Sequence, residues 1–176
     1  MIASARNIQD TGKTATCVGL LRYDLKWNGY IPDEVYVNYE LRIPGVHCLS
    51  KEKMIAFLMD MIKGGKKHKL IHITEADRLF PARFWQDKKQ TEALLGLWQD
   101  VKMFWKVYWD SHIGSSVDIL MRQTRQLAIV PHGYEKTTDE IPFTIINGLY
   151  RKRVHKVLCN CSRLVFPLYD RWAGIE

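Results

Sequence analysis

Apolar residues along this chain fall into short runs and longer helical stripes. Short, mostly branched or small apolar runs predict three strands, at residues 1–5, 35–39 and 70–73. Residues 15–25 and 51–62 carry apolar side chains at helical spacing, and Ser50 is placed to cap the second of these helices. Strands that alternate with helices predict an α/β fold, with a mainly parallel sheet and helices on both faces.

The second half of the chain has a less regular pattern. The aromatic-rich stretch 91–108 is expected to form one long helix, whose excess apolar surface serves either core packing or a subunit interface. Further strands are expected at residues 117–121, 151–157 and 163–169. Residues 124–144 contain proline, glycine and threonine, and are expected to form an excursion from the sheet.

A phosphate-binding loop is indicated between the first strand and the first helix. A loop that ends in Gly-Lys-Thr and runs into a helix directs backbone N–H groups and the helix dipole at an anion. Lys13 would reach the β- and γ-phosphates of a nucleotide, and the Thr14 hydroxyl would hold Mg²⁺. Gly-Lys-Thr by itself also fits a solvated helix start. The expected nucleotide-contacting residues are Asn7, Gln9, Asp10, Thr11, Gly12, Lys13 and Thr14.

Two polar residues follow the strand at residues 70–73, where ligands of α/β proteins bind. P-loop NTPases carry an Asp for Mg²⁺ at this strand tip, followed by a Glu that polarises the attacking water. Here the two positions are Thr74 and Glu75. We therefore expect Thr74 near the metal, without a charge, and Glu75 as the residue that orients water. The alternative is a core strand followed by an acidic helix cap.

The order of the motifs resembles that of a known family. Residues 71–83 resemble the strand, Asp-Glu-Ala and Trp-Pro-x-Arg segment of Zot-like phage assembly ATPases. Residues 111–114 and 117–123 resemble their Arg-His-x-Gly, Asp-Ile and Thr-Gln sequence, and residues 165–170 with Glu176 resemble their closing motif. Genome-packaging ATPases of membrane-containing viruses, in the FtsK–HerA group, share this order. The resemblance implies one P-loop NTPase (RecA-like) domain over residues 1–176, with ATP and Mg²⁺ as cofactors.

The chain departs from that family near the phosphates. Asn7 stands where the loop glycine is usual, Thr74 replaces the metal Asp, and Ser111 replaces an Arg. Arg122 replaces a Thr, and Asn147 stands where the family usually has an Arg. Each change removes charge or fit, so the resemblance supports fold and nucleotide binding more directly than hydrolysis.

Gln123 is expected at a strand end beside the strand of Glu75. There it would act as a polar sensor of the γ-phosphate, or it would hydrogen-bond to the backbone. His72 lies within the strand at residues 70–73, which favours a core histidine over a ligand. For an arginine that reaches a neighbouring subunit's nucleotide, the candidates are Arg122, Arg125 and Arg151.

The formal charge of +7 and the pI near 9.2 favour an acidic partner. Arg151, Arg153 and Lys156 lie on a cationic strand that suits an edge or a subunit contact. They are expected to bind DNA without sequence preference, or to pair with acidic residues such as Asp139 and Glu140 of a neighbouring subunit.

Composition narrows the setting. The chain has 176 residues, of which 47% are hydrophobic. No apolar run reaches the roughly 18–20 residues that a membrane span needs. The first residues do not have a signal-peptide pattern, so a cytoplasmic location, in the host cell if the protein is viral, is expected.

Three functions remain open at this point. The first is an ATPase subunit of a virus or phage assembly or DNA-packaging motor, which hydrolyses ATP to move DNA as a homo-oligomeric ring. The second is a nucleotide-binding structural subunit that does not hydrolyse, supported by Asn7 and Thr74. The third is a DNA-binding protein that has lost its nucleotide.

Overall fold

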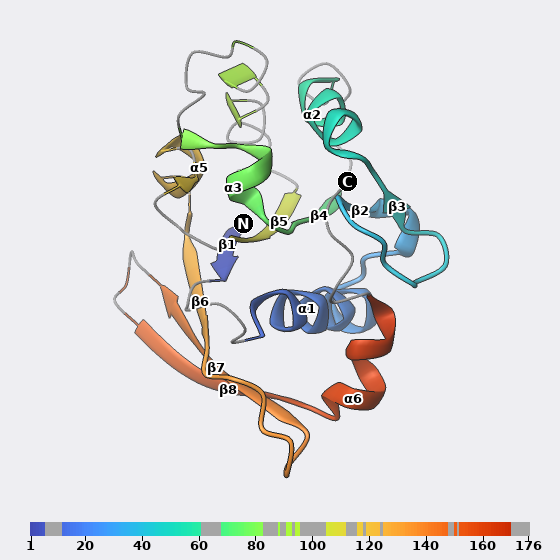
Figure 1. Ribbon diagram of the computed structural model, residues 1–176, viewed down its shortest axis with the longest axis vertical. Coiled ribbons are helices and arrows are strands. Elements are labelled where there is room, and N and C mark those ends of the chain that lie inside the picture. Colours follow the sequence, from blue (N-terminus) through green and yellow to red (C-terminus); the bar gives the residue numbers. More distant parts are fainter. Residues whose placement is uncertain are drawn as a thin grey trace.

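The computed structural model describes residues 1–5, 12–60, 68–82, 88, 91–92, 94–95, 105–111, 116–117, 119–123, 125–147, 150 and 152–169. Within these residues, eight strands form one sheet in the order β3-β2-β4-β5-β1-β6-β7-β8 (Figure 1). The strands are β1 (Ile2–Ala5), β2 (Val35–Val37), β3 (His47–Cys48), β4 (Lys69–Ile73), β5 (Trp105–Asp110), β6 (Leu127–Pro131), β7 (Glu140–Asn147) and β8 (Lys152–Cys159).

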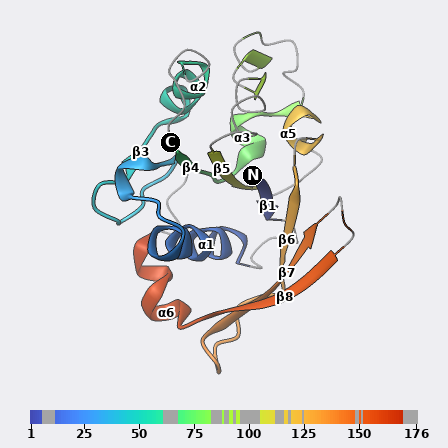
Figure 2. The ribbon, with the colours of Figure 1, turned by 180° about the vertical axis from the view of Figure 1, so that it is seen from behind.

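Helices lie on both faces of the sheet (Figures 1 and 2). α1 (Lys13–Trp27) and α6 (Cys161–Leu164) cover one face. α2 (Lys51–Asp60), α3 (Ala76–Leu79) and α5 (Ile119–Gln123) lie on the other. Two 3₁₀ turns, Pro32–Glu34 and Phe166–Leu168, complete the described elements. None of the helices in the described ranges combines the length and the apolarity that crossing a bilayer requires.

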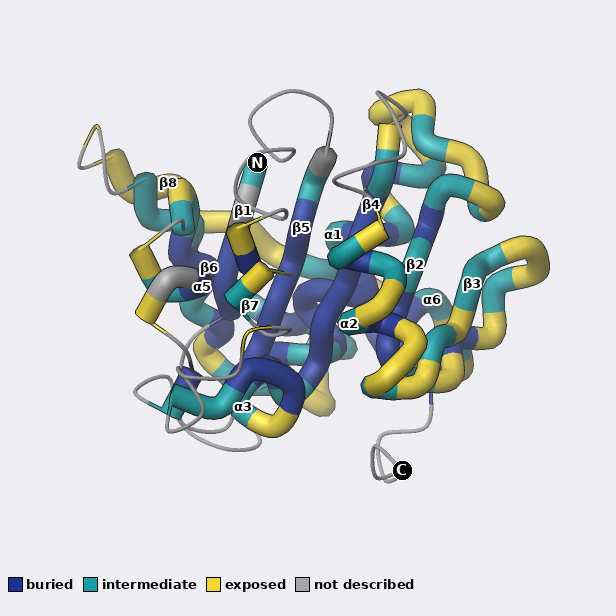
Figure 3. The backbone as a smooth tube through the Cα atoms, turned by 90° about the horizontal axis from the view of Figure 1, so that it is seen from above, coloured by how far each residue is buried: buried dark blue, intermediate teal, exposed yellow. Residues whose placement is uncertain are grey.

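The sheet is parallel from β3 to β6, and β7 and β8 continue it in antiparallel pairs. Each face has its own apolar core. Ile71 and Val107 pack with α2, whereas Leu70 and Tyr108 pack with α1. The central strands β1, β4 and β5 are therefore buried on both sides, as Figure 3 shows. The predicted α/β fold, with a mainly parallel sheet between helices, is confirmed.

Several predicted elements are found where the pattern placed them. β1, β2 and β4 match the three expected strands, and α1 and α2 match the two expected helices within the described residues. The strand expected at residues 151–157 is β8, which lies at an edge of the sheet. The first six residues of β8 are all exposed, so both faces of the strand are accessible to solvent there.

The prediction of a helix over residues 91–108 is wrong for residues 105–108. Residues 105–110 form β5, paired in parallel with β4 and with β1. Val107 and Trp109 face one core while Tyr108 faces the other, so the alternation has a period of two. The density of aromatic residues hid this period, because every position in the run is bulky regardless of the face it occupies.

The elements expected after β5 also need correction. Residues 119–123 form helix α5 rather than a strand, because β5 already fills the place between β4 and β1. The expected excursion at residues 124–144 contains β6 and the start of β7. In place of the strand expected at residues 163–169, there are α6 and a 3₁₀ turn, after which Tyr169 bridges to Leu41.

A buried ionic contact fixes α1 against the sheet. Asp24, on the sheet-facing side of α1, is fully buried. Its carboxylate accepts hydrogen bonds from Lys106 Nζ and Asn28 Nδ2, and from Tyr108 Oη at 2.8 Å. Because Lys106 and Tyr108 both belong to β5, this contact aligns the first helix with the strand beside β1.

Replacing Asp24 by Asn should lower the free energy of unfolding by about 3–5 kcal/mol, since Lys106 then keeps a charge in a site where it is 18% exposed. The double variant Asp24→Asn, Lys106→Met should recover most of this loss, because no unpaired charge remains. Urea unfolding followed by circular dichroism measures both. A single variant as stable as the wild type would contradict the anchoring role.

Candidate functional site

The first helix begins directly after a glycine with a left-handed backbone. Gly12, directly before the helix, has φ 80° and ψ 29°, a left-handed conformation that glycine adopts without strain. Its carbonyl accepts hydrogen bonds from the backbone N–H and the hydroxyl of Thr16, both at 2.8 Å. Lys13 is buried at 7% exposure, an unusual position for a lysine. The predicted loop residues Asn7, Gln9, Asp10 and Thr11 lie outside the described residues.

Thr74 is held at the carboxyl end of β4 by the end of β2. Asn38 Nδ2 donates to the Thr74 carbonyl at 2.9 Å, and the Thr74 N–H donates to Asn38 Oδ1 at 2.8 Å. Both residues are buried. The paired hydrogen bonds fix the Thr74 backbone, and with it the direction in which the hydroxyl points.

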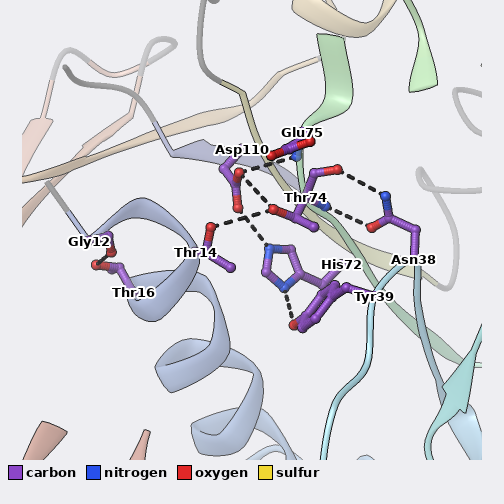
Figure 4. Close-up of polar contacts among 9 residues, drawn as sticks. All are labelled: Gly12, Thr14, Thr16, Asn38, Tyr39, His72, Thr74, Glu75 and Asp110. Atoms are coloured by element: carbon purple, nitrogen blue, oxygen red, sulfur yellow. Dashed lines mark hydrogen bonds and ion pairs between the residues drawn. The ribbon is translucent and has the colours of Figure 1, made fainter. Parts of the chain in front are cut away.

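A chain of polar contacts joins α1 to the two central strands (Figure 4). Thr14 Oγ1 lies 3.4 Å from Thr74 Oγ1, and the Thr74 hydroxyl donates to Asp110 Oδ1 at 3.1 Å. Asp110 is the last residue of β5 and is 3% exposed. The residue of the phosphate loop that would hold a metal is therefore one hydroxyl away from a buried carboxylate.

Glu75 has an unusual backbone. It adopts φ 50° and ψ 49° just before α3, a left-handed conformation that costs a non-glycine residue about 1–3 kcal/mol. Its N–H donates to Asp110 Oδ1 at 3.3 Å, which stabilises this conformation. Arg78 Nη1 lies 2.9 Å from Glu75 Oε2, and because the Arg78 side chain is 57% exposed, this ion pair is weak enough to separate.

Asp110 has a second buried partner in His72. His72 Nε2 lies 3.3 Å from Asp110 Oδ2, and Tyr39 Oη lies 2.8 Å from His72 Nδ1. Burial, with the charge of Asp110, raises the pKa of Tyr39 well above its usual range, so its hydroxyl keeps the proton. Burial also raises the pKa of Asp110, but the hydrogen bond and charge of His72, with the Glu75 and Thr74 donors, outweigh this and lower it overall.

A second group of possible metal ligands shares this residue. Ligand atoms of Cys17, His72 and Asp110 lie within 4.8 Å of one another, and all three residues are buried. Burial and then the nearby Asp110 raise the pKa of Cys17 well above its usual value. A thiol is a poor metal ligand until it loses its proton. The three residues therefore suit the hydrogen bonds of His72 with Tyr39 and Asp110 better than a bound metal ion. His72 is thus a core histidine with partners on both ring nitrogens, as its strand position indicated.

The sequence-predicted residues separate into two groups. Thr14, Thr74 and Glu75 come together at the carboxyl edge of the sheet (Figure 4), and Lys13 precedes Thr14 as the first residue of α1. Gln123 does not lie at the expected strand end, because it belongs to α5 and is exposed. The strand end beside Glu75 is occupied by Asp110 instead.

The basic residues lie on the edge strand. Arg153 and Lys156 are exposed on β8, and Arg151 lies outside the described residues. Among the described residues, Asn38 and Asp110 contact Thr74 and were not predicted as site residues. A signal for Asp110 is present in the chain, as a carboxylate that ends the two-residue alternation of residues 105–110.

The residues at this edge fit a magnesium ion. The hydroxyls of Thr14 and Thr74 are hard oxygen donors, the kind that Mg²⁺ prefers, and the Asp110 carboxylate adds negative charge behind Thr74. The lysine at the start of α1 adds positive charge for a phosphate group.

No protein-family model and no curated protein sequence matches this chain. Solved structures do. The N-terminal domain of zonular occludens toxin from Neisseria meningitidis matches with a TM-score of 0.64 at 15% identity, over 96% of this chain and 98% of that one. The genome packaging NTPase B204 from Sulfolobus turreted icosahedral virus 2, in complex with ATP-gammaS, matches with a TM-score of 0.57 at 10% identity, over 88% and 95%.

A further structure of B204, the DNA-packaging ATPase from Sulfolobus Turreted Icosahedral Virus, matches with a TM-score of 0.56 at 12% identity, over 88% and 95% of the two chains. At these identities the likeness establishes the fold. It confirms the predicted P-loop NTPase fold. The resemblance to Zot-like and genome-packaging ATPases is thereby confirmed as a resemblance in fold.

Acid should weaken the fold through Asp110. A carboxyl group whose pKa is lowered on folding stabilises the folded state fully when the pH is above its ordinary pKa, here 3.8. This stabilisation is lost as the pH falls from 3.8 through the pKa of the folded state. We therefore expect Asp110→Asn to be less stable than the wild type at neutral pH, with a difference that narrows below about pH 3.8. Denaturant unfolding across this range measures the difference. The control is Asp60→Asn, at the exposed end of α2. A constant difference at every pH would be inconsistent with the charge of Asp110 as its cause.

Proposed function

We propose that this protein is a nucleotide-binding ATPase subunit of a virus or phage assembly or DNA-packaging motor. The observation that carries the proposal is the contact of Thr14, which follows Lys13 at the start of α1, with Thr74, which precedes Glu75 after β4. A P-loop fold with this contact can bind a nucleoside triphosphate and position water at its γ-phosphate.

Each residue has a defined role in this proposal. The N–H groups at the start of the 15-residue helix α1 bind the phosphates, and Lys13 neutralises their charge. Thr14 would hold Mg²⁺, with Thr74 beside it; the ion, when bound, supplies charge stabilisation to the phosphoryl group. Glu75 orients the attacking water once its ion pair with Arg78 opens.

The motor assignment is supported by the structural neighbours and by charge. The B204 structures are described as those of a genome packaging NTPase and a DNA-packaging ATPase. The net charge of +7 and the exposed Arg153 and Lys156 on β8 suit contacts to a phosphate backbone. We propose that the chain acts as a homo-oligomeric ring on DNA, with one domain per chain.

A second function has one observation in its favour. Thr74 carries no charge at the position where P-loop NTPases place a metal-binding Asp. A subunit that binds a nucleotide for structural reasons would tolerate this change. Turnover, measured with and without DNA, separates this function from the motor.

Lys13→Ala should abolish binding of a fluorescent ATP analogue, because the phosphates lose their buried cation. Glu75→Gln should leave that binding near the wild-type value and remove turnover, because a neutral amide does not accept a proton from the attacking water. The pair discriminates between binding and chemistry in equilibrium titration and phosphate-release assays. Turnover that persists in Glu75→Gln would move the water-orienting role to another residue.

Replacing Arg153 and Lys156 by Glu should weaken binding to every DNA sequence equally, because backbone contacts do not read bases. For about six phosphate contacts, wild-type affinity should fall ~10³-fold between 50 and 200 mM salt, and the slope should be shallower in the variant. Lys51→Glu, Lys53→Glu is a charge-matched control on α2, where acidic residues in the first turn are tolerated. Equal losses in both double variants, or lost assembly with intact DNA binding, would argue against β8 as the DNA contact.

A further inference from the structure

We propose that Asp110 positions the nucleotide's Mg²⁺, so that β5 supplies the negative charge that Thr74 does not supply from β4. Asp110 acts through the Thr74 hydroxyl and is therefore a positioning residue rather than a direct ligand. This inference rests on the proposed nucleotide-binding function, and it names the residue that completes the metal site of that function.

Two successive contacts connect helix α1 to the carboxylate of Asp110. Thr14 Oγ1 lies 3.4 Å from Thr74 Oγ1, and Thr74 Oγ1 donates to Asp110 Oδ1 at 3.1 Å. In the sheet, β5 lies between β4 and β1, and Asp110 lies opposite Ala5, the last residue of β1. A charge on β5 therefore acts on an ion beside Thr14 through one intervening hydroxyl.

The surroundings of Asp110 keep its carboxylate fixed. Oδ1 accepts from the Thr74 hydroxyl and the Glu75 N–H, and Oδ2 faces His72 Nε2. The Asp110 side chain is 4% exposed and His72 is fully buried, so neither group can turn away into solvent. A buried charge is costly unless it is paired, and here it also holds two residues of the proposed site in place.

The position of Asp110 also explains the residue at position 74. An Asp at position 74 would bring a second carboxylate to within hydrogen-bonding distance of Asp110, where like charges repel. Threonine avoids the repulsion and donates a hydrogen bond to the existing charge. We therefore infer that only one of positions 74 and 110 can be acidic.

The test compares binding of a fluorescent, non-hydrolysable ATP analogue in Mg²⁺ and in EDTA. Wild-type protein should bind more tightly in Mg²⁺. Asp110→Asn should lose about 10–100-fold of that gain, the usual effect of removing a partner of a metal ligand, while affinity in EDTA stays within about twofold. The double variant Asp110→Asn, Thr74→Asp returns the carboxylate from β4 and should recover the gain.

Two further variants keep the test decisive. Thr74→Val retains Asp110 but removes the linking hydroxyl, so it should also lose the Mg²⁺ gain, including in the case where Asp110→Asn does not fold. Cys17→Ala should keep the gain, because Cys17 is not part of the proposed arrangement. Loss of the gain in Cys17→Ala would place the ion among Cys17, His72 and Asp110 and overturn the proposal.

The remaining outcomes are also distinct. An equal loss in Mg²⁺ and EDTA for Asp110→Asn, without recovery in the double variant, would show a structural role and overturn the inference. A full Mg²⁺ gain in Asp110→Asn or in Thr74→Val would do the same while leaving nucleotide binding in place. Failure of the wild type to bind the analogue under either condition would overturn the proposed function itself.

Discussion

The carboxylate of Asp110 is the contact on which the site depends. It accepts hydrogen bonds from Thr74 and Glu75 and faces His72, so three residues of β4 and its extension are fixed by one group on β5. Electrostatic interactions are stronger in a buried site than in water, and Asp110 is almost fully buried. The left-handed backbone of Glu75 is tolerated because its N–H has this acceptor.

The topology explains why one residue can reach so many partners. β5 pairs with β4 on one side and with β1 on the other, and Asp110 lies opposite Ala5 in register. Parallel strands end at the same edge of a sheet, so the ends of β1, β4 and β5 meet there. Asp24 on α1 binds Lys106 and Tyr108 of β5, so the helix that begins at Lys13 is aligned with the same strand.

The sequence indicated the start of α1 and the first strands more clearly than the rest. Gly12, Lys13 and Thr14 are recognisable because their order is tied to local geometry, and β4 is recognisable because it is apolar on both faces. Asp110 was hidden, because a strand of alternating bulky residues follows a stretch that also suits a helix. The prediction for Gln123 is wrong for the same reason: the strand beside that of Glu75 is β5, not residues 117–121.

A charge near a bound ion acts through distance and surroundings, not through the strand that carries it. Of positions 74 and 110, only position 110 carries a carboxylate, which avoids like-charge repulsion between the two side chains. Threonine also contributes a donor, which orients the carboxylate in a way that a second acid could not. The threonine at position 74 and the aspartate at position 110 therefore depend on each other. The role of either residue can be interpreted only together with the other.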